Sequence, residues 1–199
     1  MTREAARARL AKAYVGVAGC GGLGSNCAAA LARAGVGRLL VADFDLVSES
    51  NLDRQFFFRD QVGRPKALAL AENLRRIDPG VREESRVARI GPAEALELFS
   101  GCDAVVEAFD EAEAKAMLVE TVLRRLPGTW LVAASGLAGY GRSGALKVRA
   151  SGRFVICGDL ESEVGPENPP FAPRVGIVAN MEANAVLSIL LGGGPGEEA

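Results

Sequence analysis

The sequence predicts an α/β protein with a doubly wound, mainly parallel sheet and an antiparallel C-terminal extension. Short apolar runs alternate with helix-forming segments as far as Ala134, which is the pattern of βαβ units. The first unit, Tyr14 to Asp45, places a glycine-rich turn between its strand and its helix. Such a turn exposes backbone N–H groups at the start of a helix, where they bind phosphate.

Length and composition indicate one domain. With 199 residues, 49% of them hydrophobic, the chain suits a single domain over 1–199 with a flexible tail at 192–199. A net charge of −2 argues against a nucleic-acid partner. The N-terminus lacks a signal-peptide core, and no apolar run approaches the roughly 20 residues that span a bilayer. We therefore expect a cytoplasmic protein without a membrane partner.

The glycine turn follows a strand over Tyr14 to Ala18 and reads Gly19-Cys20-Gly21-Gly22-Leu23-Gly24, which satisfies G-x-G-x-x-G. Gly19 permits the tight turn, and Gly21 lets backbone approach a phosphate. Gly24 lets the following helix, from about Leu23 to Ala34, pack against the strand. This unit predicts a Rossmann-like nucleotide site.

A second strand, Arg38 to Ala42, ends at Asp43. This carboxylate lies about 20 residues beyond the glycines, where such folds bind a ribose hydroxyl. A glycine turn with a purely structural role is the alternative. The strand before it, the helix after it and the acid at this distance each favour nucleotide binding.

Helical segments are expected over Arg3 to Ala13 and over Pro65 to Ile77, which stops before Asp78-Pro79-Gly80. The mixed polarity of Val81 to Ile90 indicates an edge strand, and Pro92 to Phe99 fits a helix. A fourth strand, Cys102 to Phe109, leads to Asp110 at its carboxyl end.

The second half of the chain begins with a helix over Glu111 to Leu123 and a strand over Trp130 to Ala134. A glycine-rich connection follows at 136–144. Two further strands, Gly144 to Arg149 and Phe154 to Cys157, are predicted to be antiparallel additions. A proline-rich acidic loop then precedes the closing helix, Val175 to Leu191, whose face is apolar.

The residues after Ala42 indicate a narrower class of nucleotide-binding protein. They read DFDLVSESNLDRQ over 43–55, and GRPK follows at 63–66. This pattern resembles the ATP-binding signature of the ThiF/MoeB superfamily, the ubiquitin-activating-enzyme-like adenylyltransferases. Asp110 and the sequence APRVG at 172–176 extend the resemblance over most of the chain. It is most similar to the short ThiF-type sulfur carrier protein adenylyltransferases of thiamine biosynthesis.

The resemblance implies a set of site residues. ATP would be bound by Gly19, Gly21, Gly22, Leu23, Gly24, Asp43, Asp45, Asn51, Arg54 and Lys66. Catalysis would use Arg54 and Lys66, with Asp110 as the magnesium ligand. From the residues alone, alternatives stay open: the cations in a solvated loop, Asn51 capping a short helix, and Asp110 as the N-cap of the next helix.

The implied reaction is that of an ATP-dependent adenylyltransferase, a nucleotidyltransferase. It joins the C-terminal Gly-Gly carboxylate of a ThiS-like, ubiquitin-fold sulfur carrier protein to the α-phosphate of ATP and releases pyrophosphate. A carboxylate is ionised at neutral pH, so the reaction needs electrostatic stabilisation more than a general base. A chain without histidine is compatible with that.

Three other functions would also account for part of the sequence. Activation of a molybdopterin-type carrier protein would use the same residues. A non-catalytic module that binds nucleotide or carrier protein would keep the fold without needing the cations. A nicotinamide oxidoreductase would share the glycine turn but would leave Arg54, Lys66 and Asp110 without a purpose.

The four cysteines, Cys20, Cys27, Cys102 and Cys157, form no C-x-x-C pair, so we expect no zinc site. Many members of the resembled superfamily carry two such pairs, and a crossover loop here must be ordered in another way. Some use a cysteine for a covalent link to the carrier protein. Cys157, at the end of a strand, is the candidate for that link, and a buried, inert thiol is the alternative.

The resemblance also implies a homodimer. Phe56 to Phe58 and the apolar face of Val175 to Leu191 offer hydrophobic surface for it. In the resembled superfamily an N-terminal arginine reaches the neighbouring subunit's ATP. Arg3, Arg7 and Arg9 are candidates, although the motif that carries this arginine is missing.

Overall fold

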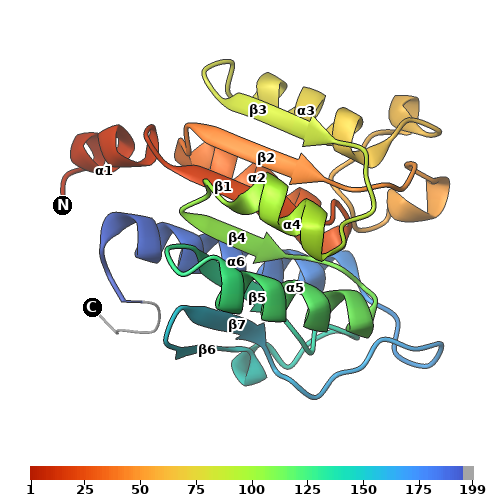
Figure 1. Ribbon diagram of the computed structural model, residues 1–199. Helices are drawn as coiled ribbons and strands as arrows, with labels where there is room; N and C mark the ends of the chain where they lie inside the picture. Colours follow the sequence, from red (N-terminus) through yellow and green to blue (C-terminus); the bar gives the residue numbers. More distant parts are fainter. Residues whose placement is uncertain (195–199) are drawn as a thin grey trace.

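A computed structural model describes residues 1–194 and contains a seven-stranded sheet of order β3-β2-β1-β4-β5-β7-β6 (Figure 1). The strands are β1 (Tyr14–Ala18), β2 (Arg38–Ala42), β3 (Arg82–Arg86), β4 (Ala104–Glu107), β5 (Trp130–Ala134), β6 (Lys147–Ser151) and β7 (Phe154–Gly158). β1 to β5 run parallel. The strand order reverses at β1, which has β2 on one side and β4 on the other.

Helices cover both faces of the sheet (Figure 1). One face carries α2 (Gly22–Ala34), α3 (Lys66–Ile77) and α6 (Ala172–Leu191), and the other carries α4 (Pro92–Phe99) and α5 (Ala112–Arg125). The doubly wound, mainly parallel architecture is therefore confirmed. The short helix α1 (Arg3–Leu10) lies against the end of α6, where Arg9 Nη1 donates to the carbonyl of Leu191 at 3.2 Å.

The antiparallel extension is smaller than the sequence predicted. β7 pairs parallel to β5, and only β6 is antiparallel. The chain leaves β5 through a long connection, runs back along the edge as β6 and returns through a hairpin, so β7 points the same way as β5. A short apolar run specifies burial but not direction, which the connection decides.

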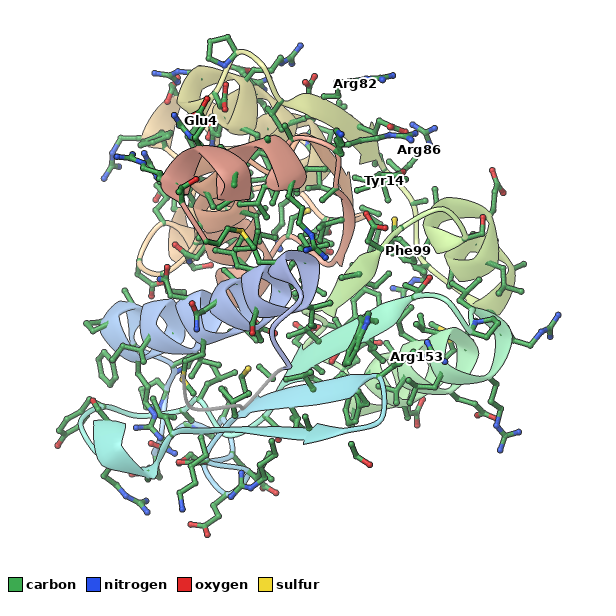
Figure 2. The ribbon with its side chains drawn as sticks, turned by 90° about the vertical axis from the view of Figure 1, so that its left-hand side faces the viewer. Glu4, Tyr14, Arg82, Arg86, Phe99 and Arg153 are labelled. Carbon is green, nitrogen blue, oxygen red and sulfur yellow. The ribbon has the colours of Figure 1, made fainter. Side chains whose placement is uncertain are left out.

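Both edges of the sheet carry charged side chains. β3 has the sequence REESR, and the predicted edge position of this strand is confirmed. Figure 2 shows Arg82 and Arg86 pointing outward from this edge. The opposite edge strand, β6, exposes Lys147 and Arg149.

The closing helix α6 corrects one statement from the sequence. Its 20 residues are long and apolar enough to cross a membrane by length and composition, although no such run was expected. Half of an 18-residue apolar stretch of this helix is buried in the fold, and α6 packs along α2. At its end Gly192 adopts a left-handed cap, with its N–H donating to Ile189. The predicted flexible tail thus begins as a helix cap, and 195–199 lie outside the described residues.

Glu182, in the middle of α6, is fully buried and neither of its carboxylate oxygens has a hydrogen-bond partner. Burial raises its pKa well above the usual value, and the charge of Glu107 raises it further, while Lys115 opposes the shift. The folded protein therefore favours the protonated carboxyl.

We predict that Glu182→Gln stabilises the protein at neutral and alkaline pH. Above the unfolded pKa the folded state holds a proton that the unfolded state has lost, so stability falls as pH rises toward the raised folded pKa. The slope is at most about 1.4 kcal/mol for each pH unit. Urea unfolding at pH 5 and pH 8 should show the variant's advantage growing with pH. An equal difference at both values would contradict a titrating Glu182.

Candidate active site

A cavity of about 800 Å³ opens at the carboxyl ends of β1, β2, β4 and β5. This position, where the strand order reverses, is the usual ligand site of an open α/β sheet. Among the sequence-predicted residues, the cavity is lined by Gly19, Gly21, Gly22, Leu23, Asp43, Asp45, Arg54, Lys66 and Asp110. The fold thus brings together residues from five separate parts of the chain.

The glycine turn joins β1 to α2, and its glycines differ in surroundings. Gly24 lies against the carbonyl of Gly19, so a side chain there would collide with backbone. Gly21 has a negative φ, and a Cβ would meet only Gln55 Nε2 at 4.0 Å. Gly21 therefore borders open space in the cavity. Since α2 has no side-chain N-cap, the N–H groups of its first turn are available to an anion.

Asp43 is buried at the end of β2 and holds the turn in place. Its Oδ2 accepts the N–H of Cys20 at 2.6 Å, and its Oδ1 accepts the N–H of Asp45 at 2.7 Å. Each carboxylate oxygen can accept a further hydrogen bond. Asp43 can therefore position the turn and still accept from a ribose hydroxyl.

Two cations reach the same cavity from the segment after β2. Lys66 Nζ donates to Asp45 Oδ2 at 2.8 Å, and only 8% of the lysine side chain is exposed. Arg54 Nη1 pairs with Asp53 at 2.7 Å and donates to the carbonyl of Ser50 at 3.1 Å. Lys66 is thus a buried, oriented cation and not part of a solvated loop.

Asp110 lies exposed at the rim of the cavity, after β4. The N-cap of α5 is Glu111, and it makes no side-chain cap bond, so the alternative that Asp110 caps this helix is wrong. No group of three or more His, Cys, Asp or Glu residues suited to a metal occurs within residues 1–194. Mg²⁺ commonly takes one or two carboxylates and completes its shell with water and substrate phosphates, which Asp110 fits.

Three predicted residues do not line the cavity. Gly24 packs below the turn, and Asn51 accepts the N–H of Ser48 at 3.0 Å in a short 3-10 helix, which is the local role left open from the sequence. Cys157 is fully buried. Burial and the nearby Glu182 raise the pKa of Cys157 to about 12, so its surroundings fit the inert-thiol alternative.

The cavity also contains residues that sequence reasoning missed. Gln55 lines it with a buried Oε1 that lacks a partner, and its place in the ATP-binding signature was a usable signal. Lys115 pairs with the buried Glu107 at 2.9 Å. Arg89 lies over the ring of Phe44 at 4.1 Å, on the side of the cavity formed after β3. Nothing in the sequence marks Lys115 or Arg89.

A phosphate-binding turn, a buried acid and two cations at the switch point define a nucleotide-binding α/β protein of the Rossmann-like class. The ThiF family matches residues 1–199, and the chain belongs to this family. The superfamily resemblance seen in the sequence is thereby confirmed.

Curated relatives agree with this membership. The chain is 40% identical over 130 residues to adenylyltransferase and sulfurtransferase MOCS3 of Bos taurus, covering 65% of this chain and 28% of that protein. It is 34% identical over 160 residues to ubiquitin-like modifier-activating enzyme 5 of Arabidopsis thaliana, covering 72% and 36%. The chain thus spans about a third of the length of these relatives.

Among solved structures, the tRNA N6-threonylcarbamoyladenosine dehydratase TcdA of E. coli, in complex with AMP, matches with a TM-score of 0.85 and 25% identity. The match covers 95% of this chain and 90% of that one. TcdA in complex with ATP matches with a TM-score of 0.82 and 26% identity.

We predict that Gly21→Ala and Gly24→Ala separate binding from folding. Gly21→Ala should leave the free energy of unfolding within about 0.5 kcal/mol of the wild type, yet weaken ATP binding about tenfold or more by filling the space a phosphate needs. Gly24→Ala should lose about 1–3 kcal/mol of stability through its clash with Gly19. Calorimetric titration and urea unfolding measure the two effects. Unchanged ATP affinity in Gly21→Ala would place the phosphates elsewhere.

Proposed function

We propose that this chain is an ATP-dependent adenylyltransferase that activates the C-terminal Gly-Gly carboxylate of a ubiquitin-fold carrier protein and releases pyrophosphate. The observation that supports it is the convergence of the glycine turn, Arg54, Lys66 and Asp110 on one cavity. A dinucleotide oxidoreductase would need the glycine turn and Asp43 but would have no use for these three side chains.

The chemistry suits this set of groups. The carboxylate oxygen forms a bond to the α-phosphorus, and the bond from that phosphorus to the pyrophosphate oxygen breaks. Arg54 and Lys66 would stabilise the charge on the phosphates, and the amides of the glycine turn would orient them. A Mg²⁺ ion held by Asp110 would supply further charge neutralisation. No proton has to be removed from the nucleophile.

The carrier would enter beside a part of the cavity surface that we do not assign to nucleotide binding. We call the cavity surface formed by 135–137 and 160–164 the loop wall. It offers backbone and mostly small or apolar side chains, which suits an extended end without side chains. We propose a ThiS-like carrier of thiamine biosynthesis in the cytoplasm as the finer assignment. The names of relatives, such as the SAMP-activating enzyme E1 of Haloferax volcanii, indicate a wider set of carriers to test.

A carboxylate on tRNA is the second candidate substrate. It is favoured by the nearly full-length match to TcdA, whose name gives a modified tRNA nucleoside as its substrate. The net charge of −2 argues against it, because tRNA binding draws on a basic surface. Activation of a molybdopterin-type carrier would use the same cavity residues, and a non-catalytic binding role would need only the fold and the nucleotide site.

We predict pyrophosphate exchange into ATP that depends on a carrier protein ending in Gly-Gly. Arg54→Ala and Lys66→Ala should each lower the exchange rate by on the order of a hundredfold, as the loss of one transition-state donor does. Arg59→Ala, an exposed cation from the same segment that does not line the cavity, should exchange like the wild type. Exchange stimulated by tRNA alone would favour the second candidate.

Asp110→Asn is expected to lose exchange activity while keeping its melting temperature, because Asp110 is exposed and does not cap α5. Raising the magnesium concentration should restore part of the activity, since asparagine weakens the site without blocking it. Exchange is measured at low and high magnesium. Full activity at low magnesium would remove Asp110 from the reaction.

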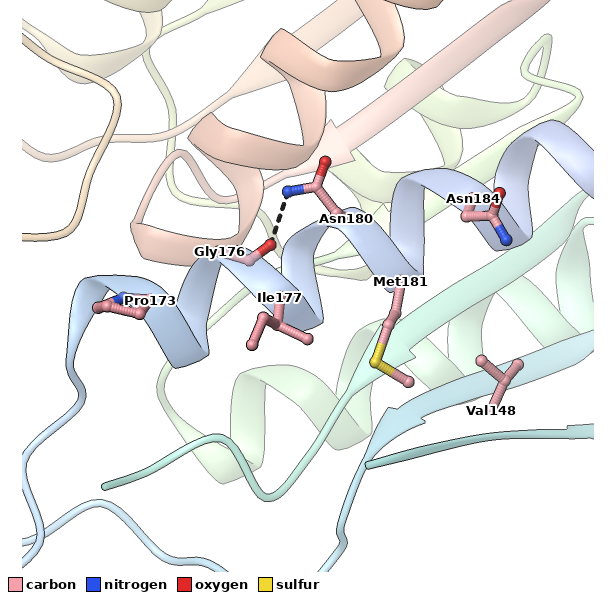
Figure 3. Close-up of a pocket in the computed structure, with 7 residues that line it drawn as sticks. All are labelled: Val148, Pro173, Gly176, Ile177, Asn180, Met181 and Asn184. Carbon is pink, nitrogen blue, oxygen red and sulfur yellow. Dashed lines mark hydrogen bonds between the residues drawn. The ribbon is translucent and has the colours of Figure 1, made fainter. Parts of the chain in front are cut away.

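We also propose a homodimer that uses the outer face of α6. A groove of about 560 Å³ lies along this helix and is lined by Val148, Pro173, Gly176, Ile177, Asn180, Met181 and Asn184 (Figure 3). The two charged residues of α6, Arg174 and Glu182, are both buried, so the outer face carries no charge. Phe58, which is 46% exposed, adds apolar surface outside this groove.

Ile177→Glu should therefore convert the dimer to a monomer, because it places a charge in the lining of the groove. Ile177 and Leu68 are similarly exposed, at 41% and 45%, and Leu68→Glu on α3 serves as the matched control. Light scattering at micromolar concentration measures the mass. A wild-type monomer, or a dimer that survives Ile177→Glu alone, would contradict the α6 interface.

A further inference from the structure

Two connections form the loop wall. One, 135–146, links β5 to β6, and the other, 159–171, links β7 to α6. They lie side by side, since Gly139 N–H donates to the carbonyl of Pro169 at 2.9 Å. Neither connection contains regular strand or long helix of its own within the described chain. Their placement must therefore come from side-chain contacts.

A buried ion pair supplies that placement. Arg174, in the first turn of α6, donates through Nη2 to Asp159 Oδ2 at 2.6 Å and through Nη1 to the carbonyl of Gly141 at 2.6 Å. The two side chains are 3% and 2% exposed. Asp159 Oδ1 also accepts the N–H groups of Glu161 and Ser162, at 2.9 and 2.8 Å. One guanidinium thus fixes both connections to one helix.

This arrangement is unfavourable in several local ways. A cation in the first turn of a helix opposes the helix dipole, and Arg174 Nε is buried without a partner. Within residues 1–194, only Arg142 and Leu160 are non-glycine residues with positive φ, 48° and 67°. Each directly follows an acceptor of Arg174, namely Gly141 or Asp159. Several unfavourable features that occur together in one place indicate a functional constraint more than a gain in stability.

Asp159 stays ionised over the pH range in which activity would be assayed. Burial raises the pKa of Asp159, but hydrogen bonds from Ser162 and Glu161 and the charge of Arg174 together lower it to about 2. Asp159 therefore remains a carboxylate at neutral pH, and the contact to Arg174 does not depend on titration.

We infer that Arg174 and Asp159 are positioning residues that hold the loop wall where the extended Gly-Gly end of the carrier lies. The inference rests on the proposed function. Both side chains are buried, so they act through the connections and do not touch the substrate. A diglycine end has no side chains to anchor it, and a shift of the wall by about 1 Å would move its carboxylate away from the α-phosphate.

The test compares the wild type with the double variant Asp159→Asn/Arg174→Met. Replacing both partners avoids leaving one buried charge alone, which would endanger folding. The matched control is Arg142→Gln, which breaks the exposed pair with Glu161 that joins the same two connections at 3.8 Å. Three quantities are measured: Kd for ATP without carrier, KM and kcat for the carrier in pyrophosphate exchange, and hydrogen exchange of both connections.

We expect the double variant to bind ATP within about twofold of the wild type. Its KM for the carrier should rise about tenfold or more, because the carrier end is no longer oriented. Hydrogen exchange should become faster in 135–146 and 159–171 and stay unchanged in α2. Arg142→Gln should match the wild type in all three measurements.

Wild-type KM together with wild-type hydrogen exchange in the double variant would overturn the positioning role. So would a parallel loss of ATP affinity, carrier KM and melting temperature, because that result describes a residue needed only for folding. A wild-type protein that exchanges with no diglycine-ended carrier would instead overturn the proposed function, and the carrier assignment with it.

Discussion

Two backbone N–H groups, from Cys20 and Asp45, converge on the buried carboxylate of Asp43, and the geometry of the cavity depends on this contact. It ties the glycine turn after β1 to the segment that leaves β2. Asp45, placed in this way, then pairs with Lys66 at the start of α3. A phosphate-binding turn and its cation are therefore oriented by one acid, before any ligand adds its own contacts.

The sequence predicted the elements that local pattern determines. β1, β2, β5 and α4 have the bounds expected, because a short apolar run or a Pro-led helix is delimited by its own turn residues. The direction of β7 was wrong, since a run of five residues does not encode which neighbour it joins. The glycine turn and Asp43 were predictable because their spacing is fixed by a single βαβ unit.

The remaining site features depend on tertiary structure. The burial of Lys66 could not be predicted from a polar, basic segment, because it follows from the return of the chain against 45–47, the segment after β2. Arg174 belongs to a motif visible in the sequence, but its partners, Asp159 and Gly141, lie 15 and 33 residues away in irregular segments. Long-range contacts between a helix and irregular segments leave no periodic signal in the sequence.

The charged edges of the sheet have a consequence for assembly. A strand from another molecule that paired with β3 or β6 would have to lie beside rows of arginine, glutamate and lysine. Such edges resist the sheet-to-sheet growth that leads to aggregation and fibrils. The protein can therefore expose the uncharged outer face of α6, where we propose that the homodimer forms, without offering a template for uncontrolled polymerisation.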